Sequence, residues 1–457
     1  MTQKRIIVLL ISLIACISGC YTQDWPQFLG PERNSTSPQK GLLRSWPENG
    51  PEVLWTVNLG IDYGGPVVKD GKVYILDRDN ETGDKMRCID LENGEELWRF
   101  AYDAPGEVSF PGSRSVPTVD GNFVYSCGHN GDLYCIDINT HKSSWNVNVW
   151  TDFGGQPIAH SGQVPHGPRP PGRFPVWAIS QCPLIYNDLL IIASQAPDAG
   201  VVAYDKLTGI LKWKTDSLGY IGYVSPSIVK VDGNEHVVMV TPSTNPFRKS
   251  TPDENVLGKI VGIDPSNGKI LWEYDKWQCH ISVPSAVDAG DNKVLVVGGY
   301  ELGAVMIKIE KQPDGSYGTT ELIRTEEFGD QTKPPLLIDG YFYAQYGTNN
   351  RRDGLTCMSM DGEIMWKTKR DPNFNKGSMI LADGLILATD GMKSLFLIEP
   401  DPTGFKPLAS SELLVSTASD DPMARMFGTQ NWAPIALADG KLLIRDQRRM
   451  MGVKVAE

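Results

Sequence analysis

The sequence lacks an excess of basic residues. Its 457 residues include 43 Lys and Arg against 55 Asp and Glu, which gives a formal net charge of −12. Binding to nucleic acid requires a basic surface that neutralises phosphates, so the composition argues against that class of function. The sequence also lacks a Cys-x-x-Cys pair, and its 8 Cys and 6 His form no cluster with metal-ligand spacing. We therefore expect no metal site of that kind.

Long apolar runs are also absent, apart from one at the N-terminus. Lys4 and Arg5 precede an apolar stretch at residues 6–17, and residues 18–20 are Ser-Gly-Cys. A run this short, ending in small residues, is typical of an export signal rather than a membrane-spanning helix. Its last four residues resemble a bacterial lipobox, which implies that Cys20 is lipidated; cleavage by the ordinary signal peptidase is the alternative. A lipidated N-terminus would bind a membrane durably, so we expect an exported protein anchored in the outer membrane and facing the periplasm.

The chain divides into three segments on this basis. Residues 1–20 form the lipoprotein-type signal peptide. Residues 21–51, rich in Pro, Gly, Ser and Asn, are predicted to be a tether. Residues 52–457 contain an internal repeat, which predicts one supersecondary unit copied many times and stacked to bury a shared core.

The repeat contains a motif of fixed spacing, in which three residues separate Asp from a small residue and three more separate the small residue from Trp. Its copies are Asp90-Gly94-Trp98, Asp137-His141-Trp145, Asp205-Gly209-Trp213, Asp264-Gly268-Trp272 and a shortened Asp361-Gly362-Trp366. Glycine permits a positive φ in a turn, Asp can hydrogen-bond turn backbone, and Trp can bury its ring between neighbouring units. We interpret all three as structural residues and none as catalytic.

Hairpin signals determine the architecture. Each copy opens with a short apolar strand and turns at Asp-Gly or similar, which indicates a four-stranded antiparallel blade. Strand openings recur at eight positions: Pro66, Pro117, Pro183, Pro226, Pro284, Pro335, Met379 and Pro434. The sequence therefore predicts an all-β fold, an eight-bladed β-propeller of four-stranded antiparallel blades. The fifth blade has lost its Trp, whose expected place is near Ile323 and Arg324. The seventh blade lacks the motif.

The eighth blade lacks an outer strand before the chain ends. Residues 52–57 resemble a Trp-bearing fourth strand. We expect this N-terminal strand to pair with the C-terminal strand at 452–455, because that pairing closes the ring and removes its exposed edges.

The repeat also explains three cysteines. Cys88 and Cys135 lie ten residues before their Trp, where other copies have Ala203 and Gly262, and Cys357 lies nine before its Trp. This position in the repeat requires a small side chain, and Cys behaves there as a small hydrophobic residue. The states of Cys127, Cys182 and Cys279 stay open between thiol and disulfide.

The stretch 203–213, Ala-Tyr-Asp-Lys-Leu-Thr-Gly-Ile-Leu-Lys-Trp, closely resembles the repeat of the PQQ-like family of quinoprotein-type propellers. The resemblance covers residues 52–457, and residues 24–31 and 177–184 look like exported bacterial members. The family includes alcohol dehydrogenases that depend on the quinone cofactor PQQ, and the lipoprotein BamB, a scaffold of outer-membrane assembly. The shared fold does not determine which role this chain has.

The dehydrogenase pattern is only weakly matched. Those enzymes typically have two adjacent cysteines over the cofactor, a calcium site from a Glu and an Asn, and a catalytic Asp; the sequence has no Cys-Cys pair. We therefore expect a non-catalytic, monomeric scaffold or ligand-binding module with an envelope protein as partner, similar to BamB. The alternative is an enzyme, either a quinone-dependent dehydrogenase using PQQ with calcium or a hydrolase. Carbohydrate or other small-ligand capture is a third reading.

A long irregular connection, residues 150–177, exceeds what the repeat requires. Such loops on compact scaffolds are commonly functional. Its Pro-rich sequence with basic and aromatic residues predicts a partner contact; the candidates are His160, His166, Arg169, Arg173 and Trp177.

The residues just before each innermost strand should surround one mouth of the central channel. Those positions are Arg114, Gln181, Tyr223, Ser282, Lys333, Lys376, Asn431 and Trp432, with Arg425 close in sequence. Several cations in one concavity would focus positive potential. We expect a pocket there that accepts a small anionic ligand; ordinary turn polarity is the alternative.

Overall fold

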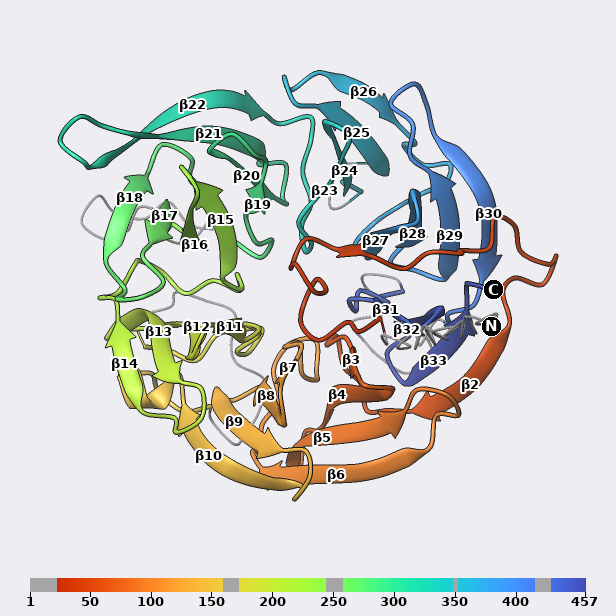
Figure 1. The fold of residues 1–457 in the computed structure, drawn as a ribbon, viewed down its shortest axis with the longest axis horizontal. Coiled ribbons are helices and arrows are strands. Elements are labelled where there is room, and N and C mark those ends of the chain that lie inside the picture. Colours follow the sequence, from red (N-terminus) through yellow and green to blue (C-terminus); the bar gives the residue numbers. More distant parts are fainter. Residues whose placement is uncertain (1–22, 159–171, 244–257, 348–351, 416–428) are drawn as a thin grey trace, which may run out of the picture.

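The computed structural model describes residues 23–158, 172–243, 258–347, 352–415 and 429–457. It confirms the all-β, eight-bladed propeller, with the blades arranged in a ring around a central axis (Figure 1). Within the described residues, the only helical element is the 3-10 turn η1 (Thr151–Phe153). In the same ranges no helix is long and apolar enough to span a membrane.

Each of the first four blades consists of four consecutive strands, from the axis outward. Their bounds are β3 (Val67–Lys69), β4 (Lys72–Asp79), β5 (Gly83–Asp90) and β6 (Glu96–Asp103); β7 (Thr118–Asp120), β8 (Phe123–Cys127), β9 (Asp132–Asp137) and β10 (Lys142–Asn148); β11 (Leu184–Tyr186), β12 (Leu189–Ala196), β13 (Ala199–Asp205) and β14 (Leu211–Lys214); and β15 (Ser227–Val231), β16 (Asn234–Thr241), β17 (Lys259–Ile263) and β18 (Ile270–Tyr274).

The remaining blades follow the same order, except that the outer strand of blade eight comes from the N-terminal part of the chain. Their bounds are β19 (Val287–Asp288), β20 (Lys293–Gly298), β21 (Gly303–Lys311) and β22 (Tyr317–Thr325); β23 (Leu336–Ile338), β24 (Tyr341–Gln345), β25 (Leu355–Ser359) and β26 (Ile364–Lys367); β27 (Met379–Ala382), β28 (Leu385–Thr389), β29 (Ser394–Glu399) and β30 (Lys406–Glu412); and β31 (Ala436–Ala438), β32 (Lys441–Arg445), β33 (Arg449–Lys454) and β2 (Val53–Asn58).

The predicted closure of the ring is confirmed. Strand β2 pairs antiparallel with β33, and Trp55 lies opposite Gly452. The indole N–H of Trp55 donates to the carbonyl of Leu91 in blade one at 2.9 Å. The N-terminal strand therefore completes blade eight and also contacts blade one, so that no edge is left open at the junction.

The repeat residues have the structural roles predicted for them. Each Trp lies opposite a small residue on the neighbouring strand, in the pairs Trp98–Cys88, Trp145–Cys135, Trp213–Ala203, Trp272–Gly262 and Trp366–Cys357. The three cysteines have no exposed surface. The six described cysteines are all buried free thiols, including Cys127, Cys182 and Cys279.

The Trp of one blade can pack on the turn of the next blade, whereas the indole N–H of Trp272 donates to His236 Nδ1 of its own blade at 3.0 Å. The indole N–H of Trp145 donates to the carbonyl of Lys206 at 3.0 Å, and that of Trp213 donates to Pro265 at 3.1 Å. Gly209 has a φ of +71°, and a Cβ there would lie 2.7 Å from the Trp145 ring. In the fifth blade, Ile323 takes the place of the lost Trp and packs on Gly362. The residues of the repeated motif therefore form contacts between adjacent blades.

Residues 23–51 differ from the predicted tether. Trp25 is 2% exposed and forms a bridge with Val68 of blade one, and Leu42 forms a bridge with Ala456. Between them β1 (Thr36–Ser37) pairs in parallel with β27 of blade seven. In Figure 1 this segment, coloured red, crosses the centre of the ring. The segment is docked because its few large apolar side chains find buried positions between the inner strands, which its Pro-rich and Gly-rich composition did not reveal.

Candidate functional site

The predicted channel mouth brings three cations around a pair of stacked aromatic rings. The Trp432 ring stacks on Tyr63, with centroids 5.5 Å apart. The Lys376 ammonium lies 4.1 Å from the Trp432 ring centroid, and the Arg114 guanidinium lies 5.2 Å from that of Tyr63. Lys333 donates from Nζ to the carbonyl of Trp432 at 2.9 Å. Residues from blades one, two, six, seven and eight therefore converge here.

The other predicted mouth residues form hydrogen bonds within the fold. Gln181 donates from Nε2 to the carbonyl of Gly222 at 2.9 Å. The backbone N–H of Tyr223 donates to Ser282 at 2.9 Å. Asn431 donates from Nδ2 to the carbonyls of Met392 and Val415, so its amide stabilises backbone. Arg425 lies outside the described residues.

Two buried carboxyls lie close to the mouth's cations, that of Asp62 near Arg114 and that of Asp330 near Lys333 and Lys376. Backbone N–H groups of Thr332 and Lys333 donate to Asp330 Oδ1 at 2.8 and 3.0 Å, and the backbone N–H of Gln345 donates to Oδ2 at 3.2 Å. Burial raises the pKa of Asp330 to about 6, and burial lowers the pKa values of Lys333 and Lys376 to about 8 each. At neutral pH the charged forms of Asp330, Lys333 and Lys376 dominate, and the two ammonium groups outnumber the Asp330 carboxylate.

Several buried polar atoms at this end of the propeller have no hydrogen-bond partner among the described residues. They are Trp177 Nε1, Ser180 Oγ, Ser282 Oγ, Thr332 Oγ1, Asn431 Oδ1 and Trp432 Nε1. Buried polar atoms in folded proteins are nearly always satisfied, by protein, water or ligand. At the mouth, water or a polar ligand would satisfy these groups.

The predicted partner loop is only partly described. His160, His166 and Arg169 lie outside the described residues. Trp177 belongs to the channel mouth, because its ring lies 5.2 Å from that of Tyr223. Arg173 is described and has a partner of its own.

Sequence reasoning missed two aromatic residues of the mouth, Tyr63 and Phe110. The Phe110 ring lies 5.9 Å from Trp432 and 6.4 Å from Tyr63. Tyr63 stands three residues before Pro66, just ahead of the opening of blade one. Tyr63 could have been predicted by applying to blade one the rule used for the other blades, that the residues just before the innermost strand lie at the mouth.

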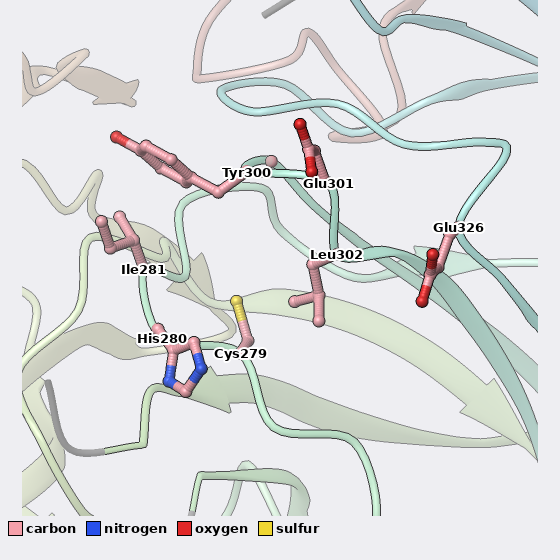
Figure 2. Close-up of a pocket in the computed structure, with 8 residues that line it drawn as sticks. Cys279, His280, Ile281, Tyr300, Glu301, Leu302 and Glu326 are labelled. Carbon is pink, nitrogen blue, oxygen red and sulfur yellow. The ribbon is translucent and has the colours of Figure 1, made fainter. Parts of the chain in front are cut away.

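A concavity away from the mouth residues lies beside blades four and five and has a volume of about 410 Å³ (Figure 2). Its lining includes His280, Tyr300, Glu301 and Glu326. His280 Nδ1 lies 2.7 Å from Ser243 Oγ, and burial lowers the pKa of His280. Among the described residues no carboxylate is hydrogen-bonded to His280, so the pair lacks the third member of a nucleophilic triad.

The mouth can be tested for its fit to the quinone cofactor that the resemblance implies. An aromatic pair with three cations suits a planar anion, and these residues would bind and orient it. The calcium partner is not matched, because within the described ranges no group of three His, Cys, Asp or Glu could hold a metal ion. The residues present therefore fit an anion and not the cofactor's metal.

Comparison with known proteins gives two kinds of relative. A family model described as "Outer membrane protein assembly factor BamB" matches residues 39–164 and 83–368. The quinohemoprotein alcohol dehydrogenase of Comamonas testosteroni is 23% identical over 271 residues, 49% of this chain and 35% of that protein. The quinone-dependent alcohol dehydrogenase subunit of Gluconobacter oxydans is 23% identical over 266 residues, 47% of this chain and 32% of its own. The chain thus spans about a third of these curated relatives.

Solved structures show the same fold. The Comamonas testosteroni dehydrogenase superposes with a TM-score of 0.59 at 13% identity, covering 95% of this chain and 81% of the other. BamB from Moraxella catarrhalis superposes with a TM-score of 0.53 at 10% identity, covering 88% and 99%. At such identities the likeness supports the propeller fold and leaves the activity open.

Proposed function

The chain belongs to the family of outer membrane protein assembly factor BamB, and we propose that it is a non-catalytic propeller that binds a small anion at its channel mouth. One observation supports this most: Arg114, Lys333 and Lys376 converge on the stacked pair of Tyr63 and Trp432. The relatives include both a scaffold and dehydrogenases, so the function has to follow from the site.

The chemistry of the site favours an anion with an apolar, planar part. Charge-assisted hydrogen bonds from Lys or Arg to a carboxylate or phosphate are about twice as strong as neutral ones. The faces of Tyr63 and Trp432 offer a surface on which a flat ligand can stack. The unpaired Trp432 Nε1 provides a donor whose hydrogen bond the fold itself does not supply.

We place this binding function in the cell envelope. The export-type N-terminus and the lipobox-like Cys20 support an exported, membrane-anchored protein, and the family match supports an envelope protein as its partner. In this arrangement the propeller is a scaffold held near the membrane, and the ligand at the mouth regulates or stabilises its contact with the partner.

Calorimetric titration of the purified full chain tests the anion site. We use benzoate as the probe and benzamide as its uncharged counterpart. Benzoate should bind and benzamide should bind at least about tenfold more weakly, because a hydrogen bond to a charged group contributes about 1.5–3 kcal/mol. Lys376→Gln should weaken benzoate binding by a similar factor. Lys406→Gln is the matched control, since Lys406 lies on the outer strand of blade seven and pairs with Asp401 in the preceding turn.

The dehydrogenase alternative rests on a specific observation, the match of about half of the chain to quinone-dependent alcohol dehydrogenases. Purified protein incubated with PQQ and calcium distinguishes the two functions. Tight cofactor binding with dye-linked alcohol oxidation would replace the proposal by an enzyme. Benzoate binding without oxidation would support it, and equal affinity for benzoate and benzamide would contradict it.

A further inference from the structure

The hairpin turns of the blades form the face of the propeller opposite the mouth. In blades one to seven, the turn between the first and second strands and the turn between the third and fourth lie at the same end, because neighbouring strands run antiparallel. In blade three the backbone N–H of Lys206, in the outer turn, donates to the carbonyl of Asp188 in the inner turn at 2.9 Å. The mouth residues precede the innermost strands and so lie at the other end. We call the end that carries the turns the turn face.

The N-terminal segment enters the ring at the turn face. The backbone N–H of Gln23 donates at 2.7 Å to Oδ1 of Asp439, in the turn between β31 and β32. Asp24 pairs with Lys69 at 2.6 Å and accepts from the backbone N–H of Asp70 at 2.9 Å, in the turn between β3 and β4. Residue 23 therefore lies on the side of the ring opposite the mouth.

The distance from this point to the predicted lipidation site is short. Only Tyr21 and Thr22 separate Cys20 from Gln23. Three residue steps span at most about 11 Å, since a fully extended chain covers about 3.6 Å per residue. An acylated cysteine is held at the membrane surface by its buried acyl chains. Lipidation of Cys20 would therefore hold the turn face close to the bilayer.

Exposed apolar side chains gather at the same face. Among the described residues, Ile210 and Leu207 are the most exposed large apolar residues, at 62% and 56%. Both lie in the turn between β13 and β14, and exposed Leu211 follows them; we call these three residues the apolar turn. Leu97 and Leu408 are also exposed and lie near the starts of β6 and β30, just after the outer turns of blades one and seven. Adjacent exposed apolar residues mark a surface that contacts protein or membrane.

The lysines beside the apolar turn are paired with carboxylates. Lys206 pairs with Asp120 of blade two at 2.8 Å, and Lys212 pairs with Asp205 at 3.2 Å. Attraction to anionic lipid depends on clusters of basic residues. At this turn a membrane contact therefore depends on burial of apolar side chains and does not require anionic lipid.

We propose that the turn face docks on the lipid surface and that the mouth opens away from the membrane. This inference rests on the lipid anchor in the proposed function and goes beyond it by orienting the propeller. The apolar turn enters the headgroup region, where burial of its side chains adds to the binding that the acyl chains provide. The mouth is then open to the envelope protein partner and to soluble anions.

Fluorescent labelling of the acylated full chain on vesicles tests the orientation. The six described cysteines are buried, so a cysteine introduced at an exposed position takes the label selectively. Leu207→Cys places an environment-sensitive label in the apolar turn. Glu326→Cys is the matched control, because Glu326 is exposed and lies between β22 and β23, at the end opposite the turn face. One set of vesicles is phosphatidylcholine with a nitroxide-labelled lipid, and a second set also contains phosphatidylglycerol.

The two labels should respond in opposite ways. In both vesicle sets the Leu207→Cys label should shift its emission to the blue and be quenched by the lipid nitroxide, because it enters the headgroup region. The Glu326→Cys label should keep its emission wavelength and be quenched by aqueous iodide, because it faces away from the lipid.

The other results contradict the inference in distinguishable ways. Nitroxide quenching of the Glu326→Cys label, or iodide quenching of both labels in a chain held by its acyl groups, overturns the orientation and leaves the anchor standing. Nitroxide quenching of the Leu207→Cys label only with phosphatidylglycerol present overturns the apolar contact. A chain whose Cys20 carries no lipid in mass spectra overturns both this inference and the membrane placement in the proposed function, while the benzoate titration still decides the anion site.

Discussion

Replacing Trp55 by alanine should weaken the closure of the propeller more than any exposed change in the same strand. Trp55 is 7% exposed and fills the junction between blades eight and one. Its ring packs on two glycines: a Cβ on Gly452 would lie 2.4 Å from it, and a Cβ on Gly94 would lie 2.9 Å away. Its N–H donates to Leu91 across the junction at 2.9 Å.

The size of the effect follows from these contacts. A buried Trp removes about 150–250 Å² from water, which at about 25 cal/mol per Å² corresponds to about 4–6 kcal/mol. Substitutions of buried Trp by Ala cost about 3–5 kcal/mol in practice, because the site relaxes in part. We therefore expect a loss of about 4 kcal/mol in the free energy of unfolding. For about 400 ordered residues, an unfolding entropy of about 2.1 cal/mol/K per residue converts this to a fall in Tm of about 5 °C.

Thermal unfolding followed by calorimetry measures this change, with urea titration as a second measure. Val53→Ala is the matched control, because Val53 lies on the same strand and is 40% exposed; it should change stability by less than about 0.5 kcal/mol. A Trp55→Ala protein that melts within 1 °C of wild type, by this estimate about 1 kcal/mol or less, would refute the closure reasoning. Truncation of β33 should be more damaging still, since it removes the partner of β2.

Three further predictions concern packing, cysteines and pH. Gly262→Val should destabilise the fold by more than about 2 kcal/mol in urea titration, because its Cβ would lie 2.0 Å from the Trp272 ring, whereas Gly71→Ala, with no atom within 4 Å, should lose only the roughly 1 kcal/mol of its strained turn. The six described cysteines should resist a thiol reagent in the native state and react in denaturant, since all are buried; fast native labelling of Cys88, Cys135 or Cys357 in mass spectra would contradict the packing. Anion affinity should fall as pH rises through about 8, where Lys333 and Lys376 lose their protons, and should increase as pH falls through about 6, where Asp330 becomes neutral; calorimetric titrations from pH 5 to 9 that show the opposite slope would exclude these groups as the site.

The candidate site shows where sequence reasoning stops. Lys333, Lys376 and Trp432 could be assigned to the mouth because the repeat fixes which residue precedes each inner strand. Asn431 came from the same rule, yet its amide N–H bonds to two backbone carbonyls. The rule gives the position of a residue, whereas the local hydrogen bonds decide where its side chain points.

The N-terminal segment shows a different limit. Its Pro, Gly and Ser content predicts a tether, but Trp25 and Leu42 dock it into the ring. Neither residue belongs to a periodic pattern, so no local signal distinguishes a docked coil from a free one.

By itself the sequence determined the number of blades, their strand order and the closure by residues 53–58. It could do so because the Trp of a repeat with fixed spacing lies against a small residue of its own blade and can reach the turn of the next, as Trp55 does with Gly452 and Gly94. Only the tertiary structure decided which charges meet at the centre. Arg114, Lys333 and Lys376 are far apart in sequence, and their meeting around Tyr63 and Trp432 depends on how the ring closes, since electrostatic interaction depends on distance in space.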